Sequence, residues 1–248
     1  MNKICLIGSK GFIAKNFLTQ NNNKKLIFSL INKKNINQKI NILKKSDFLL
    51  HFAGTNRSND KKDFKKSNVY LINIIKKHIQ ENKEIKIIYL STNKINENSI
   101  YGKTKRKGEK LLVDFCKKKK ITLYVYRLPN IFGKWSKPFY NSVVSTFCYS
   151  IMNNKSYTNL FPQKKIIFSF VDDLIKSINK LIAKKKHLKR VQYIDDYKKN
   201  KISLKILEDK IKSFKQIKYK KNFDIFKTSF DKKLYSTYIS YCDKNNFL

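Results

Sequence analysis

The sequence predicts an α/β fold, a Rossmann-type doubly wound parallel sheet with a small C-terminal lobe. Short apolar segments typical of buried parallel strands alternate with segments whose apolar residues recur at helical spacing. Five of the six glycines fall in the turns between these segments, where the backbone must bend or make room. A chain of 248 residues with 41% hydrophobic residues can bury one such core.

The first predicted strand, residues 2–7, runs directly into a glycine-rich turn and a helix that reaches residue 20. Such a turn lets backbone N–H groups approach a pyrophosphate at the helix N-terminus, which predicts a dinucleotide site. The alternative is an ordinary strand–helix turn. Ala14, at the third small position, still allows close packing of helix on strand. The residues that we assign to cofactor binding in this turn are Gly8, Ser9, Lys10, Gly11, Phe12 and Ile13.

The second strand, residues 25–31, ends where dinucleotide-binding folds select their cofactor. Proteins that bind NAD place an Asp or Glu there to hold the ribose hydroxyls, but no acidic residue precedes Asp47 in this chain. Asn32 and Lys33 follow the strand instead, and Lys10 lies in the phosphate turn. These residues suit a 2′-phosphate, so the sequence favours NADPH over NADH.

A short helix over residues 35–45 and a further strand lead to the small residues Ala53 and Gly54. At the carboxyl end of a sheet, small residues let a cofactor lie against the backbone. We interpret His51 as a packed strand-end residue. Arg57 is either a phosphate or substrate contact or an exposed surface residue.

A helix over residues 63–81 and a strand over residues 85–90 come next, and the strand ends in Ser91 and Thr92. A hydroxyl at this position can donate to a substrate carbonyl, or it can cap the turn. We prefer Thr92 as the catalytic hydroxyl and keep Ser91 as the second candidate.

Tyr101 and Lys105 lie four residues apart at the head of a helix that reaches about residue 120. Residues with this spacing project from the same helix face. An ammonium about 4 Å from a phenol, at an effective dielectric of ~20, favours the phenolate by roughly 4 kcal/mol, about three pK units. The pair is therefore predicted to transfer protons, with Lys105 lowering the pKa of Tyr101.

The formal net charge of +39 raises the question of a nucleic-acid partner. The lysines, however, are spread over the whole length among asparagine and isoleucine, and an A/T-rich genome would produce this excess without selection for binding. We therefore expect no nucleic-acid partner, although the charge would attract anionic small molecules. A non-catalytic relative that binds nucleic acid is retained as an alternative.

Four cysteines lie far apart without a C-x-x-C pair, and there are three histidines. This pattern predicts reduced, mostly buried thiols and no metal site. The sequence shows neither a signal peptide nor an apolar run long enough to cross a bilayer, so we expect a cytoplasmic protein that has no membrane partner.

Six motifs, in order along some 170 residues, resemble the extended short-chain dehydrogenases/reductases that act on nucleotide sugars. Three longer stretches, which begin at His51, Tyr126 and Asp231, resemble the capsular polysaccharide reductases of the UDP-N-acetyl-L-fucosamine pathway, which join a reductase domain to a C-terminal cupin. The six motifs are Gly8-x-x-Gly11-x-x-Ala14, His51-Phe-Ala-Gly54, Ser91-Thr92, Tyr101-x-x-x-Lys105, Arg127-Leu-Pro-Asn-Ile-Phe-Gly133 and Phe170-Val-Asp-Asp173.

The resemblance implies an NADPH-dependent reduction at C4 of a UDP-2-acetamido-2,6-dideoxy-hexos-4-ulose, in capsule or O-antigen sugar nucleotide biosynthesis. It makes Tyr101 the proton donor, lets Lys105 hold the nicotinamide ribose, and adds Pro129 to the cofactor site. For Trp135 and Tyr140, packing within the lobe is the alternative. The residues expected on the substrate side are Arg57, Asn130, Lys134, Trp135, Lys137, Tyr140 and Asn141.

We expect residues 1–248 to form a single unit, with a nucleotide-binding core over 1–134 and 166–196 and a substrate-binding lobe over 135–165 and 197–248. The chain from about residue 159 onward is expected to contain a strand at 166–168, an N-terminal helix cap at Asp172, a strand at 191–194, and helices near 202–214 and 223–240.

The sequence ends about where the family's cupin would begin, so we expect C3 epimerisation to be lacking or supplied by a separate cupin epimerase. A homodimer is a further expectation. The alternative enzyme is an NAD-dependent epimerase or dehydratase of the same superfamily. Asn93 and Lys94 follow Thr92 where dehydratases generally carry an acidic pair, which disfavours a dehydratase.

Overall fold

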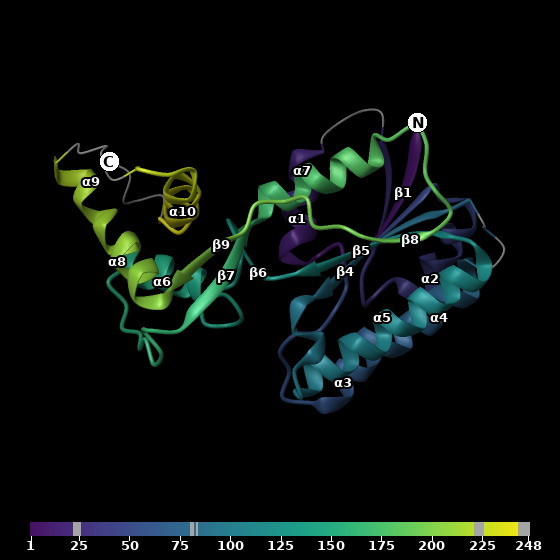
Figure 1. Ribbon diagram of the computed structural model, residues 1–248, viewed down its shortest axis with the longest axis horizontal. Helices are drawn as coiled ribbons and strands as arrows, with labels where there is room; N and C mark the ends of the chain where they lie inside the picture. The colour runs from purple at the N-terminus through teal and green to yellow at the C-terminus, as the bar shows by residue number, and fades with distance from the viewer. Residues whose placement is uncertain (22–25, 80–81, 83, 221–225, 243–248) are drawn as a thin grey trace. The chain divides into compact units, whose positions relative to one another are not determined.

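The computed structural model describes the chain apart from residues 22–25, 80–81, 83, 221–225 and 243–248 (Figure 1). Two compact units make up the fold. The first comprises Met1–Leu128 and Ile175–Asp196, and the second comprises Pro129–Leu174 and Tyr197–Leu248.

A six-stranded parallel sheet forms the centre of the first unit, in the order β2-β1-β3-β4-β5-β8. The order reverses at β1, which pairs with β2 on one side and β3 on the other, and open α/β sheets bind ligands at such a switch point. The Rossmann-type fold predicted from the sequence is thus confirmed. The strands are β1 (Asn2–Ile7), β2 (Leu26–Ile31), β3 (Phe48–His51), β4 (Lys86–Thr92), β5 (Thr122–Leu128) and β8 (Val191–Tyr193).

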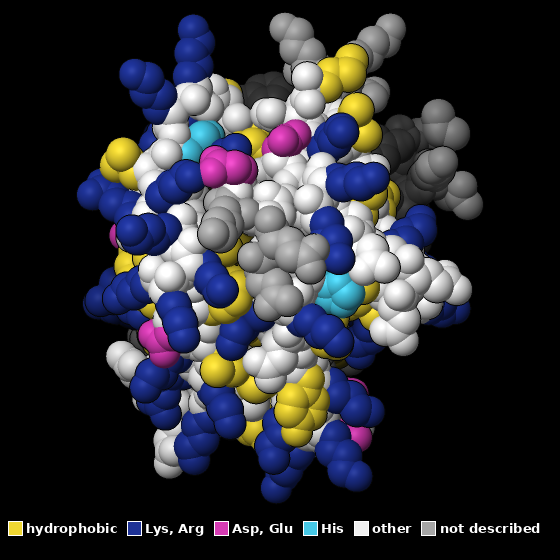
Figure 2. Space-filling model, turned by 90° about the vertical axis from the view of Figure 1, so that its right-hand side faces the viewer, with side chains coloured by type: hydrophobic (Ala, Val, Ile, Leu, Met, Phe, Trp, Pro, Cys, Tyr) yellow, Lys and Arg dark blue, Asp and Glu magenta, His cyan; other side chains and the backbone are white. Residues whose placement is uncertain are grey.

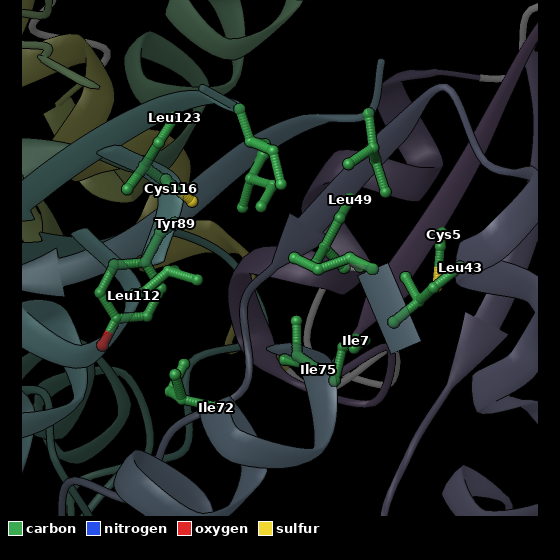
Figure 3. Packing of buried hydrophobic residues seen from close by; sticks show 14 of the residues in the cluster. Cys5, Ile7, Leu43, Leu49, Ile72, Ile75, Tyr89, Leu112, Cys116 and Leu123 are labelled. Carbon is green, nitrogen blue, oxygen red and sulfur yellow. The ribbon is translucent and has the colours of Figure 1, made fainter. Parts of the chain in front are cut away.

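Helices cover both faces of this sheet because successive side chains of each strand point to opposite faces (Figure 1). On one face, alternate strand residues pack with α4 (Leu71–Ile79) and α5 (Ile100–Lys119), as Figure 3 shows for Leu49, Tyr89 and Leu112. On the other face, α1 (Phe12–Gln20) places the Phe17 ring 5.7 Å from the Phe52 ring. The sheet is therefore buried between two helical layers.

The helix predicted over residues 63–81 begins earlier and is interrupted. It consists of α3 (Lys61–Lys65), a π-helical turn η2 (Lys66–Tyr70) and α4, and residues 80–81 lie outside the described part of the chain. Asp60 caps α3 because its side chain accepts a hydrogen bond from the Lys62 amide at 2.7 Å. The helix predicted over 35–45 is likewise composite, with α2 (Ile36–Lys39) followed by a 3₁₀ turn, η1 (Ile40–Lys45).

The second unit contains a three-stranded sheet, in which β7 (Lys165–Phe170) pairs in parallel with β6 (Asn130–Phe132) and antiparallel with β9 (Asn200–Ser203). This pairing corrects the expected division of the chain, because it removes residues 129–134 and 166–174 from the nucleotide-binding unit. The helices of this unit that pack on one another are α6 (Val143–Met152), α8 (Leu204–Ser213) and α10 (Ser229–Ile239), and α9 (Lys215–Lys220) follows α8.

The helix that follows β7 is α7 (Val171–Ile182), whose chain crosses the boundary between the units. Asp172 lies in its first turn and is not the expected N-cap, because the helix already begins at Val171. A carboxylate there still interacts favourably with the helix dipole. The helix expected near 223–240 is α10, and residues 221–225 are not among those described.

Lysine and arginine side chains are scattered over the face shown in Figure 2, with apolar and acidic side chains between them. No helix in the described part of the chain is long and apolar enough to span a membrane. Cys5, Cys116 and Cys148 are buried.

Contact between α5 and the π-helical turn requires a glycine. A Cβ added at Gly108 of α5 would lie 2.0 Å from the backbone oxygen of Asn68 in η2. Backbone atoms cannot move aside as the end of a flexible side chain can, so a larger residue at this position would have to displace backbone.

We predict that Gly108→Ala lowers the free energy of unfolding by up to about 2 kcal/mol. Alanine gains about 1 kcal/mol of helix propensity over glycine, but the clash costs about 1–3 kcal/mol. Urea unfolding measures the difference. The exposed neighbour in the same helix, changed as Lys107→Ala, serves as control and should stay within about 0.5 kcal/mol of the wild type. A stabilised Gly108→Ala protein would contradict the close contact.

Candidate functional site

The glycine turn lies against the loop that follows β3. Gly8 has a φ of +93°, and a Cβ there would lie 2.6 Å from the Ala53 nitrogen. The Gly8 amide donates to the Ile31 carbonyl at 2.9 Å, and the Gly11 amide donates to the Gly8 carbonyl at 2.9 Å. The ends of β1, β2 and β3 therefore meet at the switch point, where the backbone of the glycine turn lies directly against the loop after β3, an arrangement that fits a dinucleotide.

The end of β2 presents amide and ammonium groups. The Asn32 side-chain oxygen accepts a hydrogen bond from the Lys34 amide at 2.9 Å, and Lys33 is exposed. The sequence has no carboxylate between β2 and Asp47 that could bind ribose hydroxyls. Asn32, Lys33 and the exposed Lys10 remain the residues that we expect near the cofactor's ribose and phosphate groups.

Tyr101 lies in the first turn of α5, and its side chain is hydrogen-bonded to that of Thr92 at the end of β4. Ser99 fixes this turn by accepting a hydrogen bond from the Gly102 amide at 3.0 Å. Ser91, the second candidate hydroxyl, donates to Glu109. Thr92 is therefore the hydroxyl that contacts Tyr101, whereas the Ser91 hydroxyl contacts Glu109.

The pKa of Tyr101 is raised above its ordinary value, mainly by burial. The Thr92 hydrogen bond opposes this shift, and the negative charge of Glu97 adds to it. The direction is opposite to the lowering expected from Lys105. The physical reason is that burial disfavours the phenolate, while the Lys105 ammonium is hydrogen-bonded to a backbone carbonyl.

Lys105 is buried and lies beneath the loop after β3. Its Nζ donates to the Leu90 carbonyl at 2.7 Å and lies 4.5 Å from the centre of the Tyr89 ring. A Cβ added at Gly54 would lie 3.7 Å from this Nζ, so the ammonium is close to the backbone beside the glycine turn. Burial lowers the pKa of Lys105 to about 7, and the carboxylate of Glu109 opposes that shift.

Asn68, in the π-helical turn, ties the same loop to α5. Its Oδ1 accepts from the Thr55 amide at 3.1 Å, and its Nδ2 donates to the Thr55 carbonyl at 3.0 Å and to Thr104 Oγ1 at 3.2 Å. π-Helical turns occur frequently at functional sites. Asparagine is abundant in this chain, so the sequence did not distinguish Asn68 from the others.

His51 is packed at the end of β3, as the sequence predicted. Its side chain is buried, and its ring centre lies 5.2 Å from that of Tyr89. Burial, with the positive charge of Lys105, lowers its pKa to about 3, so the imidazole is neutral at working pH. Within the described residues, no cluster of His, Cys, Asp and Glu could hold a metal ion.

The residues expected on the substrate side fall mostly in the second unit. Trp135 and Phe139 both have a positive φ, 67° and 55°, which is uncommon for bulky residues and frequent at ligand sites. Lys134 Nζ lies 4.9 Å from the centre of the Trp135 ring. Lys137 Nζ lies 5.5 Å from the centre of the Tyr140 ring, and Asn130 Nδ2 donates to the Ile167 carbonyl at 3.4 Å. Asn141 is exposed, and Pro129 is buried at the start of this unit.

Arg57 is exposed in the first unit. Its role, and the roles of the second-unit residues in substrate binding, stay predictions.

Sequence reasoning missed Glu109. This buried residue of α5 accepts hydrogen bonds from Ser91, from Arg127 Nη2 at 2.6 Å and from the Tyr193 hydroxyl at 3.3 Å. It follows Lys105 by four residues, so it continues the helix face of Tyr101 and Lys105. The four-residue spacing from Lys105 could have identified Glu109 in the sequence.

A nucleotide cradle at the switch point, next to a tyrosine, a hydroxyl and a buried lysine, defines a nucleotide-dependent enzyme of the α/β class. Residues 4–193 match the model of the NAD dependent epimerase/dehydratase family. The chain belongs to this family of NAD(P)-dependent enzymes.

Among curated proteins, the chain is 26% identical over 250 residues to the UDP-2-acetamido-2,6-beta-L-arabino-hexul-4-ose reductase of Pseudomonas aeruginosa, with 99% of this chain and 66% of the relative covered. It therefore spans about two thirds of that relative's length.

Two solved structures have similar folds. The capsular polysaccharide assembling protein CapF from Staphylococcus aureus gives a TM-score of 0.86 at 30% identity, with 100% of this chain and 68% of that chain covered. The UDP-glucuronic acid 4-epimerase from Bacillus cereus, in complex with NAD, gives a TM-score of 0.76 at 17% identity, with 96% of this chain and 98% of that chain covered. The latter likeness concerns the fold alone.

The lowered pKa of Lys105 predicts a pH-dependent stability. An unfolded lysine titrates near 10.4, so between pH 7 and about 10 the unfolded chain binds a proton that the folded chain does not. Stability should therefore rise with pH across this window, by up to about 4 kcal/mol relative to Lys105→Met. Urea unfolding at several pH values measures this difference. Lys103→Met, at an exposed position, should show the same dependence of unfolding free energy on pH as the wild type. If Lys105→Met also showed the wild-type pH dependence, the burial of the Lys105 ammonium would be contradicted.

Proposed function

We propose that this chain catalyses the NADPH-dependent reduction of the C4 keto group of a UDP-2-acetamido-2,6-dideoxy-hexos-4-ulose. The observation that carries the proposal is the Tyr101 side chain hydrogen-bonded to Thr92, on a helix whose Lys105 lies beside the loop that meets the glycine turn. The 26% identical relative, which is named as a reductase of such a sugar, supports the choice of substrate class.

A bound nicotinamide cofactor supplies hydride chemistry. The chain's residues that would hold it are those of the Gly8–Ile13 turn, Ala53 and Gly54, with Asn32 and Lys33 at the end of β2. The cradle fits because a side chain at Gly8 would collide with the Ala53 backbone and fill the space. Asn32 and Lys33 favour NADPH since they offer donors and a positive charge to a 2′-phosphate.

Tyr101 acts as the general acid in this proposal. A reduction consumes a proton at the substrate oxygen, and burial keeps the phenol protonated because it raises the pKa of Tyr101. The Thr92 hydroxyl, which is hydrogen-bonded to the Tyr101 phenol, would donate to the same substrate oxygen and stabilise the charge that develops there. Proton donation of this kind typically contributes ~10²- to 10⁴-fold to the rate.

Lys105 adds a positive charge beneath the loop after β3. Its ammonium is fixed by the Leu90 carbonyl and the Tyr89 ring, so it is pre-oriented toward the backbone of Gly54. On the substrate side we propose Arg57 and the second-unit residues from Asn130 to Asn141. The homodimer and a separate cupin epimerase stay predictions.

We predict that Tyr101→Phe lowers kcat by ~10²- to 10⁴-fold while NADPH binding survives, because the ring is retained and only the proton donor is lost. NADPH oxidation with a UDP-4-keto-6-deoxy-HexNAc measures turnover, and NADPH fluorescence measures binding. Tyr70→Phe, at an exposed tyrosine of η2, is the control that should leave both unchanged. Undiminished turnover in Tyr101→Phe would remove this residue from the mechanism.

A carboxylate at the end of β2 should change the cofactor preference. We predict that Asn32→Asp raises KM for NADPH about tenfold, equivalent to about 1.4 kcal/mol, and improves the use of NADH, because the new charge repels the 2′-phosphate. Steady-state kinetics with both cofactors test this. Asn37→Asp, at an exposed position of α2, makes the same charge change and should alter neither KM. A wild-type enzyme that already prefers NADH would contradict the assignment.

A further inference from the structure

Glu109 occupies an unusual place for a carboxylate in this chain. Its side chain is 5% exposed, on a helix whose last turn carries three lysines. Buried charges are costly unless they are paired and hydrogen-bonded. The surroundings of Glu109 satisfy both conditions.

Donors from three strands converge on this carboxylate. Ser91 of β4 donates to Oε2, and Arg127 of β5 donates to Oε1 through Nε at 3.1 Å and through Nη2 at 2.6 Å. The Tyr193 hydroxyl of β8 donates at 3.3 Å, and its ring centre lies 4.6 Å from the Arg127 guanidinium carbon. Glu109 therefore connects α5 to three neighbouring strands at their carboxyl ends.

Two consequences for the site follow from this position. Ser91 directly precedes Thr92, so a fixed Ser91 also fixes the strand end that meets Tyr101. Glu109 also lies one helical turn beyond Lys105, and its negative charge acts on that ammonium.

The other titratable groups around Lys105 offer no compensating charge. Tyr89 of β4 is a buried phenol whose pKa is raised by burial and by Glu109, so it stays neutral. His51 of β3 is also neutral at working pH. The stabilising negative charge that acts on Lys105 thus comes from its own helix, at Glu109.

We propose that Glu109 is a positioning residue: its hydrogen bonds to Ser91 and Arg127 fix the end of β4 against α5, and its carboxylate, one helical turn from Lys105 on the same face, stabilises the Lys105 ammonium. Its effect on catalysis rests on the proposed function, whereas its effect on Lys105 does not.

The first test uses the full chain without ligand. Urea unfolding is measured between pH 5.5 and 8 for wild type, Glu109→Gln, Lys105→Met and the double variant. Glu109→Gln should have a lower free energy of unfolding than wild type, and this difference should grow as pH falls. The reason is that Lys105 of the folded variant becomes protonated only at a lower pH than Lys105 of the folded wild type. In the Lys105→Met background, the deficit from Glu109→Gln should not vary with pH.

Glu208→Gln is the matched control. Glu208 is also a buried carboxylate, hydrogen-bonded to Tyr157 at 2.8 Å and to Asn159 at 2.7 Å, but it lies in the second unit. Its variant should lose stability by an amount that is constant between pH 5.5 and 8. A constant deficit for Glu109→Gln, or a pH-dependent deficit that persists without Lys105, would overturn the proposal.

The second test measures catalysis. The pH profile of kcat/KM for NADPH reports groups of the free enzyme, and in Glu109→Gln its alkaline limb should move about one unit to lower pH. An unchanged limb in an active variant would overturn the link between Glu109 and catalysis. Absence of turnover in the wild type would instead refute the proposed reaction, and the unfolding test would still decide the role of Glu109.

Discussion

Burial of the Lys105 ammonium is the constraint on which the candidate site depends. Lys105 is the only lysine in the buried set of the described residues, although the chain carries 56 lysines and arginines. A carbonyl at 2.7 Å and an aromatic face at 4.5 Å stabilise its charge. The compensation is incomplete, since the pKa of Lys105 still falls to about 7. The groups that keep this cation in place therefore also determine its charge at neutral pH.

The arrangement around that cation depends on backbone segments that approach closely. Gly8 lets the phosphate turn lie against Ala53, and Gly108 lets α5 lie against the π-helical turn that carries Asn68. Asn68 in turn fixes the loop above Lys105 through both polar atoms of its amide. Glycine and asparagine thus link the phosphate turn, the loop after β3, the π-helical turn and α5.

Proton retention by Tyr101 agrees with the chemistry of a reduction. A phenol with a lowered pKa would suit removal of a proton from a sugar alcohol, whereas a reductase needs the protonated form as donor. Burial raises the pKa of Tyr101, and Thr92 restrains that shift through a hydrogen bond. Together the two effects leave the Tyr101 phenol protonated, the form that the proposed reduction requires of its donor.

The sequence by itself determined the features that depend on local spacing. Alternating strands and helices, glycines at the turns and the missing carboxylate after β2 are properties of short segments, so the fold class and the members of the glycine turn could be predicted. Helical spacing likewise placed Tyr101 and Lys105 on one face of α5.

Tertiary structure decided which groups those side chains meet. It distinguished Thr92 from Ser91, reversed the expected pKa shift of Tyr101, brought Glu109 into the site, and assigned β6 and β7 to a second unit. Each of these depends on burial or on hydrogen bonds between residues distant in the chain. Spacing along a helix fixes which side chains share a face, but the distance from that face to a strand, and its exposure to water, are set only when the layers pack.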